Sequence, residues 1–165
     1  GEVTYFSPIH DKELPKADFV YLPGGYPELH LEALSSNGTM LASIKEYAKQ
    51  EGKMLAECGG MMYLSSSIID ANGTKYPMVG IFGQDSTMQS ARLKLGYRYF
   101  KHKDVTYKGH EFHYSSLLSD LPSIVQQYGA KNQEVDTKLL RYKNVLAGYT
   151  HLYWAETNNL KDLFE

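Results

Sequence analysis

The stretch KMLAECGGMMYL, residues 53 to 64, decides which fold the sequence predicts. A short apolar run, Met54 to Ala56, stops at Glu57 and Cys58, two glycines follow, and an apolar run then resumes. A short apolar run bounded by polar residues is typical of a buried parallel strand. Because glycine has no Cβ, the two glycines permit a tight turn out of this strand. The stretch therefore predicts a strand, a sharp turn and a helix.

Cys58 would stand on that turn, at the carboxyl edge of the sheet, with its sulfur over the first N–H groups of the helix. A helix N-terminus favours negative charge, and thiols placed there have depressed pKa values. A thiolate on a sharp turn is what a nucleophile elbow requires. A free cysteine more often behaves as a small buried hydrophobe, so this stretch alone leaves both interpretations of Cys58 open.

The composition excludes several classes of protein. With 165 residues, 42% hydrophobic and 22% charged, the chain is expected to form one globular domain. A net charge of −2 without a basic cluster gives no support to nucleic-acid binding. No apolar run is long enough to span a membrane, and the N-terminus does not resemble a signal peptide. A single cysteine cannot form an internal disulfide, which agrees with a reducing cytoplasm.

The order of the elements predicts an α/β fold. In the first half, strand-like and helix-like runs alternate, which favours a parallel sheet with helices on its faces. From Tyr76 onward, β-branched and aromatic runs predict an antiparallel half that extends the edge of the same sheet. Strands are expected at residues 3–6, 19–22, 54–56, 78–82, 93–100, 105–107, 111–114, 125–130, 139–140 (paired with 125–130) and 149–154. Helices are expected at residues 28–34, 39–50 (capped by Ser36 or Asn37), directly after Cys58, and from 160 to 164.

The loop PGGYP, residues 23 to 27, follows the strand at residues 19–22. In open α/β sheets, ligands bind at the carboxyl ends of the strands. Gly24 and Gly25 would let backbone N–H groups approach a substrate oxygen. A simple turn is the alternative interpretation.

A cysteine nucleophile also needs a base within hydrogen-bond reach. Of six histidines, His10, His30 and His102 lie in polar or charged surroundings and are expected to be solvated. His110 and His113, in KGHEFHYS (108–115), are three residues apart, which places them on opposite faces of a strand and makes a poor zinc site. His151 follows a late apolar run and could meet Cys58 at the edge of the sheet.

Several separate motifs together resemble one family. PGGYPE (23–28), AECGGMMYL (56–64), GHEFHYS (109–115) and GYTHLYW (148–154) occur in the order seen in cobyrinic acid a,c-diamide synthases. FSPIHDKELP (6–15) also resembles the segment that leads into the oxyanion loop of those enzymes. Over nearly its whole length, the chain resembles their C-terminal glutamine amidotransferase domain.

The resemblance implies a three-layer α/β fold of the class I glutamine amidotransferase (flavodoxin-like) type, with a mixed central sheet, over residues 1–165. It also implies an N-terminal P-loop synthetase domain, which uses ammonia, ATP and Mg²⁺ to amidate a tetrapyrrole acceptor. That domain, and the first strand and helix of the glutaminase region, are expected to be missing from this chain. The chain has no GxxxxGK[ST] sequence and is expected to hold no cofactor or metal. Glutamine, the synthetase domain and the tetrapyrrole are the expected partners, and a homodimer is left open.

The resemblance also assigns roles to individual residues. Cys58 would attack the carboxamide of glutamine, giving a glutamyl thioester and ammonia. His151 would activate the thiol and later the hydrolytic water. Backbone N–H groups near Gly24, Gly25 and Gly59 would stabilise the tetrahedral oxyanion.

The chain departs from ordinary triad glutaminases at two positions. Those enzymes carry glutamate two residues after the histidine, where this chain has Tyr153, and glutamine four residues after the cysteine, where it has Met62. The sequence therefore predicts a Cys–His dyad, unless another acid orients the imidazole. His110, Glu111 and His113 belong to a family-specific segment that the resemblance places near the domain junction or the acceptor site.

Three functions remain open on the sequence. The resemblance favours amidation of the a and c carboxylates of cobyrinic acid in cobalamin biosynthesis. A related enzyme acting on hydrogenobyrinic acid or nickel-sirohydrochlorin is the nearest alternative. Cobyric acid synthase is disfavoured, because its elbow usually has Gly-Gly-Tyr-Gln where this chain has Gly59-Gly60-Met61-Met62. A non-catalytic module that binds glutamine or docks a partner would explain the missing glutamate after His151.

Overall fold

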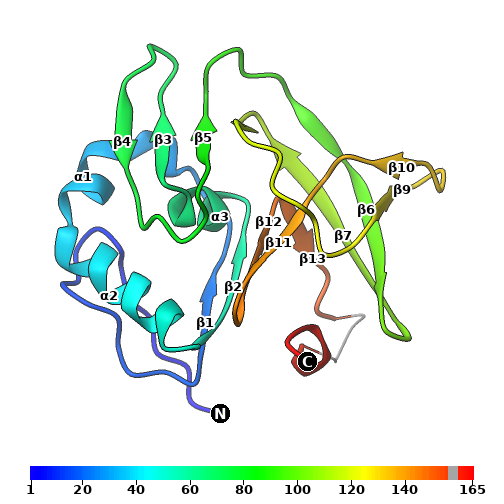
Figure 1. Cartoon of the computed structure of the whole chain (residues 1–165), viewed down its shortest axis with the longest axis horizontal. Coiled ribbons are helices and arrows are strands. Elements are labelled where there is room, and N and C mark those ends of the chain that lie inside the picture. The colour runs from blue at the N-terminus through cyan, green and yellow to red at the C-terminus, as the bar shows by residue number, and fades with distance from the viewer. Residues whose placement is uncertain (156–159) are drawn as a thin grey trace.

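The computed structural model describes residues 1–155 and 160–165, which form three sheets and a few short helices (Figure 1). Two caps, Ser36 and Asn37, were predicted for the helix at residues 39–50. The side chain of Asn37 accepts a hydrogen bond from the amide of Met40, so Asn37 is the cap of that helix. The helices are η1 (Pro27–Leu29), α1 (Leu31–Ser36), α2 (Gly38–Lys49), α3 (Gly59–Leu64) and η2 (Lys161–Leu163).

A mixed sheet of four strands runs through the centre of the molecule. Strand β2 pairs in parallel with β1 on one side and with β12 on the other, and β12 pairs antiparallel with β11. The strands, in spatial order, are β1 (Phe19–Leu22), β2 (Lys53–Glu57), β12 (Val145–Gly148) and β11 (Leu139–Tyr142). The predicted parallel pair of the first half and the mixed central sheet are confirmed.

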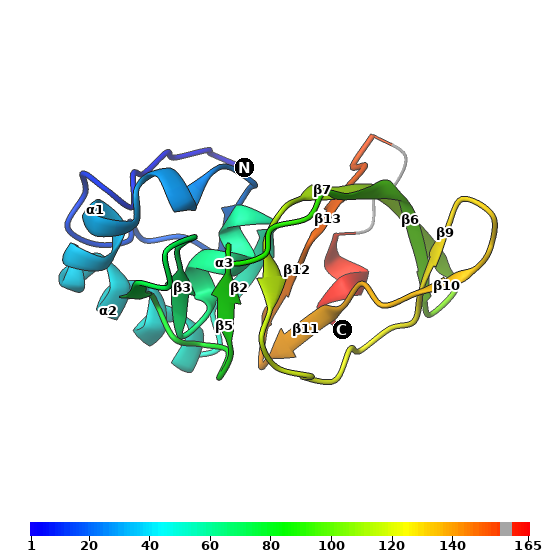
Figure 2. The same ribbon diagram turned by 90° about the horizontal axis from the view of Figure 1, so that it is seen from above.

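Both faces of the central sheet are covered. Successive side chains of a strand point to opposite faces. Accordingly, Met54 and Ala56 pack with residues of the three α-helices, whereas Leu55 packs with Phe100 and Leu163. Figure 2 shows α1, α2 and α3 on one side of the central strands, and the second sheet with the short helix η2 on the other. The three-layer α/β prediction is confirmed, with the α-helices covering only one of the two faces.

The second sheet has five strands and lies apart from the central one. The prediction that the antiparallel half extends the central sheet is therefore wrong for the strands of residues 94–113, whereas the antiparallel pair β12 and β11 does extend it. The tip of the β6–β7 hairpin is at Lys103-Asp104, as predicted, and Lys103 has the positive φ of 53° that a two-residue turn requires. The strands, in spatial order, are β10 (Glu134–Val135), β9 (Gln127–Gly129), β6 (Lys94–His102), β7 (Val105–His113) and β13 (Thr150–Leu152).

A small third sheet contains β4 (Lys75–Pro77), β3 (Ser67–Ile69), β5 (Asp85–Thr87) and β8 (Ser116–Leu117). The predicted strand at residues 78–82 is wrong. The amides of Met78 and Gly80 donate to the carbonyls of Ser66 and Ser65, at 3.0 and 2.8 Å. These bonds go to the loop that leaves α3, so this apolar segment covers the end of a helix and joins no sheet.

Three other predictions of elements are corrected. Residues 3–6 are not a strand, because no strand of the described residues pairs with them and Val3 and Tyr5 are 74% and 91% exposed. The helix at residues 28–34 is divided at His30 into η1 and α1. The terminal helix is the single 3-10 turn η2.

The strand pairings in the second half also differ from the prediction. The strands expected at residues 105–107 and 111–114 form one continuous strand, β7. Residues 125–130 and 139–140 contribute β9 and β11, which belong to different sheets. The central strand β12 was not predicted at all.

Candidate active site

Cys58 stands on the sharp turn between β2 and α3, as the sequence predicts. Its φ of 48° and ψ of −107° lie outside the usual range for a residue with a side chain. The turn is held by two hydrogen bonds: the amide of Cys58 donates to the carbonyl of Gly148, and its own carbonyl accepts from Met62. Strained backbone of this kind is characteristic of a nucleophile elbow. The side chain is largely buried, with its sulfur 3.8 Å from the carbonyl oxygen of Phe112.

His151 reaches the same point from β13. The structure brings its imidazole into contact with the side chains of both Cys58 and Glu57. The interaction with Cys58 and then that with Glu57 outweigh the effect of burial, so the pKa of His151 is raised to about 9. The ring is therefore protonated at neutral pH, which is the form that stabilises a thiolate beside it.

Glu57 is an acid of this site that the sequence did not reveal. Its Oε2 lies 3.7 Å from Nδ1 of His151, and the residue is only 2% exposed. The carboxylate accepts hydrogen bonds from the hydroxyl of Tyr21 at 2.6 Å and from the amide of Leu152 at 3.1 Å. A glutamate at the end of an apolar strand was a signal, because carboxylates are seldom fully buried without partners.

The two glycine loops pack against this group. A Cβ on Gly24 would lie 2.3 Å from the imidazole of His151, and one on Gly59 would lie 2.7 Å from the carbonyl of Gly25. Neither position can hold a side chain without displacing its neighbour. A Cβ on Gly25 would meet nothing within 4 Å, because Gly25 faces a cavity of about 220 Å³ that Cys58 and His151 also line.

The sequence of the chain identifies the family to which it belongs. Residues 1–159 match the family of CobB/CobQ-like glutamine amidotransferase domains. This chain belongs to that family.

Curated relatives match the chain over most of its length. A cobyrinate a,c-diamide synthase of Herminiimonas arsenicoxydans is 37% identical over 94% of the chain, and one of Clostridium tetani is 38% identical over all of it. A hydrogenobyrinate a,c-diamide synthase of Stutzerimonas stutzeri is 35% identical over 93%. The chain spans only 36%, 40% and 36% of the length of these three relatives.

Solved structures share the fold of this CobB/CobQ-like domain. A structure described as a glutamine amidotransferase superposes with a TM-score of 0.55 at 13% identity, covering 81% of this chain and 70% of its own. A structure from Thermoplasma acidophilum, described as that of a putative GMP synthase component, superposes with a TM-score of 0.51 at 16% identity, covering 95% and 74%. The predicted class I glutamine amidotransferase fold is confirmed.

In this CobB/CobQ-like domain, the three residues of the GHEFHYS segment take two different places. His110 lies on the outward face of β7, where its ring stacks on that of His151 with centroids 5.1 Å apart. Glu111 and His113 point inward and are 4% and 5% exposed, with Nε2 of His113 only 2.6 Å from the glutamate. The two histidines do lie on opposite faces, as their spacing predicts.

Glu111 is the centre of a buried polar network. It also accepts hydrogen bonds from Arg98 at 2.6 Å and Thr137 at 2.7 Å. Burial raises the pKa of Glu111, but the hydrogen bonds from His113 and Thr137 and the charges of His113 and Arg98 outweigh it and lower the value to about 2. Nδ1 of His113 faces the carbonyl of Ser115 at 2.9 Å, so both ring nitrogens are engaged.

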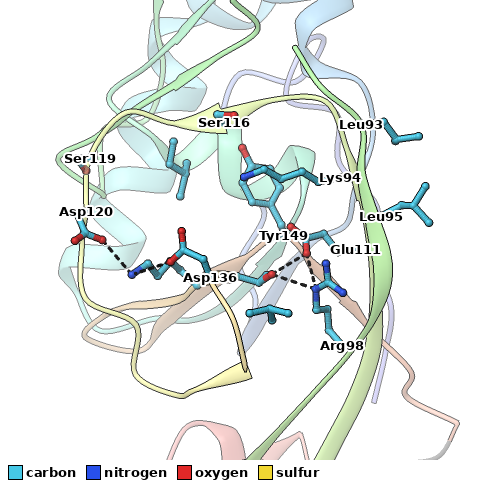
Figure 3. Close-up of a pocket in the computed structure, with 14 residues that line it drawn as sticks. Leu93, Lys94, Leu95, Arg98, Glu111, Ser116, Ser119, Asp120, Asp136 and Tyr149 are labelled. Atoms are coloured by element: carbon cyan, nitrogen blue, oxygen red, sulfur yellow. Dashed lines mark hydrogen bonds and ion pairs between the residues drawn. The ribbon is translucent and has the colours of Figure 1, made fainter. Parts of the chain in front are cut away.

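This network divides two cavities of the domain. His113 and Ser115 line the cavity of Cys58, whereas Glu111 and Tyr149 line a second one of about 440 Å³. Tyr149 closes the wall, because its ring stacks on His113 and its hydroxyl is 2.8 Å from that of Ser115. Figure 3 shows the residues that line the second cavity, with Glu111 and Tyr149 side by side among them.

Within residues 1–155 and 160–165, no three His, Cys, Asp or Glu side chains gather as a metal ion would require. None of the helices in this part of the chain is both long and apolar enough to cross a membrane.

Proposed function

We propose that this chain hydrolyses glutamine and supplies the ammonia for ATP-dependent amidation of the a and c carboxylates of cobyrinic acid in cobalamin biosynthesis. One observation carries the proposal: a cysteine on a strained turn, a histidine and the Gly25 loop line a single cavity, and Gly59 packs against Gly25. The two relatives named cobyrinate a,c-diamide synthases, which match 94% and 100% of the chain, support the choice of acceptor.

In the first proposed step, the sulfur of Cys58 attacks the carboxamide carbon of glutamine, and negative charge moves to the carboxamide oxygen. Backbone N–H groups at Gly25 and Gly59, whose loops touch, would donate to that oxygen. Removing one such donor typically costs about 3 kcal/mol of barrier height. Protonated His151 gives its proton to the departing nitrogen, the C–N bond breaks, and ammonia leaves a glutamyl thioester.

In the second step, water hydrolyses the thioester. His151, now neutral, accepts a proton from the water molecule while the oxygen attacks the thioester carbon. The C–S bond then breaks, which releases glutamate and returns Cys58 and protonated His151 to their starting state. Each turnover therefore converts one glutamine and one water into one glutamate and one ammonia.

The proposed consumer of the ammonia is a synthetase portion of the same protein, which would bind ATP and Mg²⁺. The length of the relatives outside the matched region gives room for it, since the chain spans 36 to 40% of them. An exposed apolar face supports its position. On the outward side of the β6–β7 hairpin, Leu95, Tyr97 and Phe112 are 60%, 67% and 45% exposed, and His110 joins this face to His151.

Placing a charge on this apolar face tests whether the synthetase portion docks there. In the full-length protein, Leu95→Asp should abolish amidation driven by glutamine but preserve amidation driven by added ammonium. Leu118→Asp is the matched control, because Leu118 is 58% exposed and its amide donates to Asp85 in the third sheet. Equal loss of both reactions in Leu95→Asp, or none in either, would place the partner elsewhere.

Covalent labelling tests the glutaminase. The protein is exposed to a diazo-ketone analogue of glutamine, and its intact mass is measured beside that of Cys58→Ser. A single adduct that the variant lacks is expected, because only an activated thiolate in a formed glutamine site reacts in this way. If the full-length protein takes up no adduct, the chain is a binding or docking module.

The acceptor needs a separate comparison, because one relative is named a hydrogenobyrinate a,c-diamide synthase. Full-length protein is supplied with glutamine and ATP and with cobyrinic acid, hydrogenobyrinic acid or nickel-sirohydrochlorin in turn. The highest kcat/KM is expected with cobyrinic acid. A higher value for either other ring would replace the acceptor and leave the glutaminase proposal intact.

A further inference from the structure

We propose that Glu57 is the third member of the catalytic group: it holds the imidazole of His151 toward Cys58 from the strand that carries the nucleophile. The inference rests on the proposed glutaminase function. It replaces the dyad expected from Tyr153, which stands where ordinary triad glutaminases carry their glutamate. In this chain the acid precedes the nucleophile by one residue.

The alternation of side chains in β2 explains how Glu57 reaches the histidine. Leu55 faces the second sheet, and Glu57, two residues later, faces the same way. That side of the central sheet carries β13, whose Leu152 amide donates to the glutamate. Cys58 lies beyond the end of the strand, on the turn. One strand end thus presents the acid and the nucleophile to the same imidazole from two directions.

Two hydrogen bonds fix the carboxylate where His151 needs it. Tyr21, from the neighbouring strand β1, donates to Oε2 at 2.6 Å. The amide of Leu152 donates to Oε1 at 3.1 Å, and Leu152 is the residue directly after His151. The backbone that carries the histidine is therefore tied to the acid that faces its ring.

The contact between the acid and the ring is an ion pair. The distance of 3.7 Å between Oε2 and Nδ1 is longer than a hydrogen bond, which suits a site that tightens when substrate binds. The other titratable groups around the ring are Cys58 from the elbow and His110 from β7, with Glu28 lining the same cavity. Of these, only Glu57 is both acidic and in contact with the imidazole.

The test replaces the charge and keeps the shape, with Glu57→Gln in the full-length protein. Two quantities are measured: the rate of labelling of Cys58 by the diazo-ketone between pH 6 and 10, and the titration of His151 by NMR. We expect labelling to slow by about 100-fold or more at pH 7.5. We expect the His151 titration to move from about 9 toward the ordinary imidazole value of 6.5.

Glu111→Gln is the matched control. It also removes the charge of a buried glutamate beside a histidine, but the ring nitrogens of that histidine contact Glu111 and the carbonyl of Ser115. It should leave the His151 titration in place. Glu57→Asp, with the charge kept and the reach shortened, should recover part of the labelling rate and most of the titration shift. It also serves as the second variant if Glu57→Gln folds poorly.

Glu57 would be merely structural if Glu57→Gln labels within threefold of the unaltered protein and leaves the His151 titration unmoved. The NMR titration needs no reaction. A protein that never labels, but whose His151 titration shifts in Glu57→Gln, would therefore refute the glutaminase function and retain the positioning role.

Discussion

Two buried glutamates each face a histidine in this domain, and the two pairs differ in a way that separates chemistry from support. Glu111 and His113 are 2.6 Å apart, and both side chains are at most 4% exposed. Glu57 and His151 are 3.7 Å apart, and the histidine side chain is 26% exposed. His113 and His151 both line the cavity of Cys58, but His113 is almost fully buried in its wall, whereas His151 is partly exposed.

The surroundings of the pairs explain this difference. Arg98 and Thr137 saturate Glu111, and the carbonyl of Ser115 occupies the second nitrogen of His113. No proton of that pair is free to move to a substrate. A buried ion pair so fully satisfied has a rigid geometry, and breaking it is costly. His151 has room to exchange a proton, which is what a general base requires.

Removing each histidine should break the two pairs in different ways. His151→Ala should slow labelling of Cys58 by about 10³-fold or more, because the imidazolium that stabilises the thiolate is lost, and with little change in stability, because the site is partly exposed. His113→Ala should lower the free energy of unfolding by about 3 kcal/mol and slow labelling of the folded protein by less than tenfold. Labelling rates and urea unfolding measure both. If the two variants lose labelling rate equally, the assignment of His151 as the histidine that activates Cys58 is wrong.

Removing each charge sharpens the comparison. Glu111→Gln should cost about 3 kcal/mol of unfolding free energy, because it leaves Arg98 and His113 buried beside a neutral amide. Glu57→Gln should cost about 1 kcal/mol, since its histidine is partly exposed, the amide oxygen can still accept from Leu152, and the amide NH₂ can donate to the hydroxyl of Tyr21. The measurement is urea unfolding at pH 7. If Glu57→Gln lowers the unfolding free energy more than Glu111→Gln does, the pair of Glu57 and His151 is the one that stabilises the fold.

Acid should weaken the Glu111 network selectively. The pKa of Glu111 is about 2 in the folded protein, against 4.5 for an ordinary glutamate in the unfolded chain. The folded state therefore binds a proton at this carboxylate less readily than the unfolded chain does. The stabilisation is thus present above pH 4.5 and is lost as the pH falls toward 2, by about 2 kcal/mol after screening. In urea titrations, the advantage of the unaltered protein over Glu111→Gln should shrink across this interval. An advantage independent of pH would show that the glutamate stays ionised in the unfolded chain too.

Local patterns revealed the elbow, because its determinants lie within a dozen residues of one another. The apolar run of β2, the glycines and the helix after Cys58 are each visible in the sequence and coincide in the structure. Strand β12 was missed although it pairs with β2 along its full length. Its four residues, Val145 to Gly148, become a central strand only through a partner some ninety positions earlier, and a local pattern does not contain that partner.

The acid was missed for a related reason. Glu57 was interpreted as the polar boundary of an apolar run, whereas it continues the buried strand. Tyr153 drew attention to the absence of an acid at the ordinary position, but the replacement is recognisable only when β13 is placed beside the end of β2. Likewise, alternation placed His110 and His113 on opposite faces of a strand, but it could not reveal Arg98 and Thr137, the partners of Glu111, because they come from other elements.

The smallest expected effect concerns the rings that support the two histidines. His113 stacks on Tyr149 with centroids 3.5 Å apart, and His151 stacks on His110 at 5.1 Å. Burial and then the charge of His151 lower the pKa of His110, so at neutral pH it supports the imidazole as an uncharged ring.

His110→Ala should therefore slow labelling of Cys58 by about fivefold, the equivalent of the roughly 1 kcal/mol of one aromatic contact. His110→Phe retains the ring and should stay within about twofold at pH 8. As the pH falls through the lowered pKa of His110, the Phe variant should label faster than the unaltered protein, because no second positive charge then forms beside His151. If the two variants slow labelling equally at pH 8, His110 acts through its nitrogens and belongs with the catalytic group that Glu57 completes.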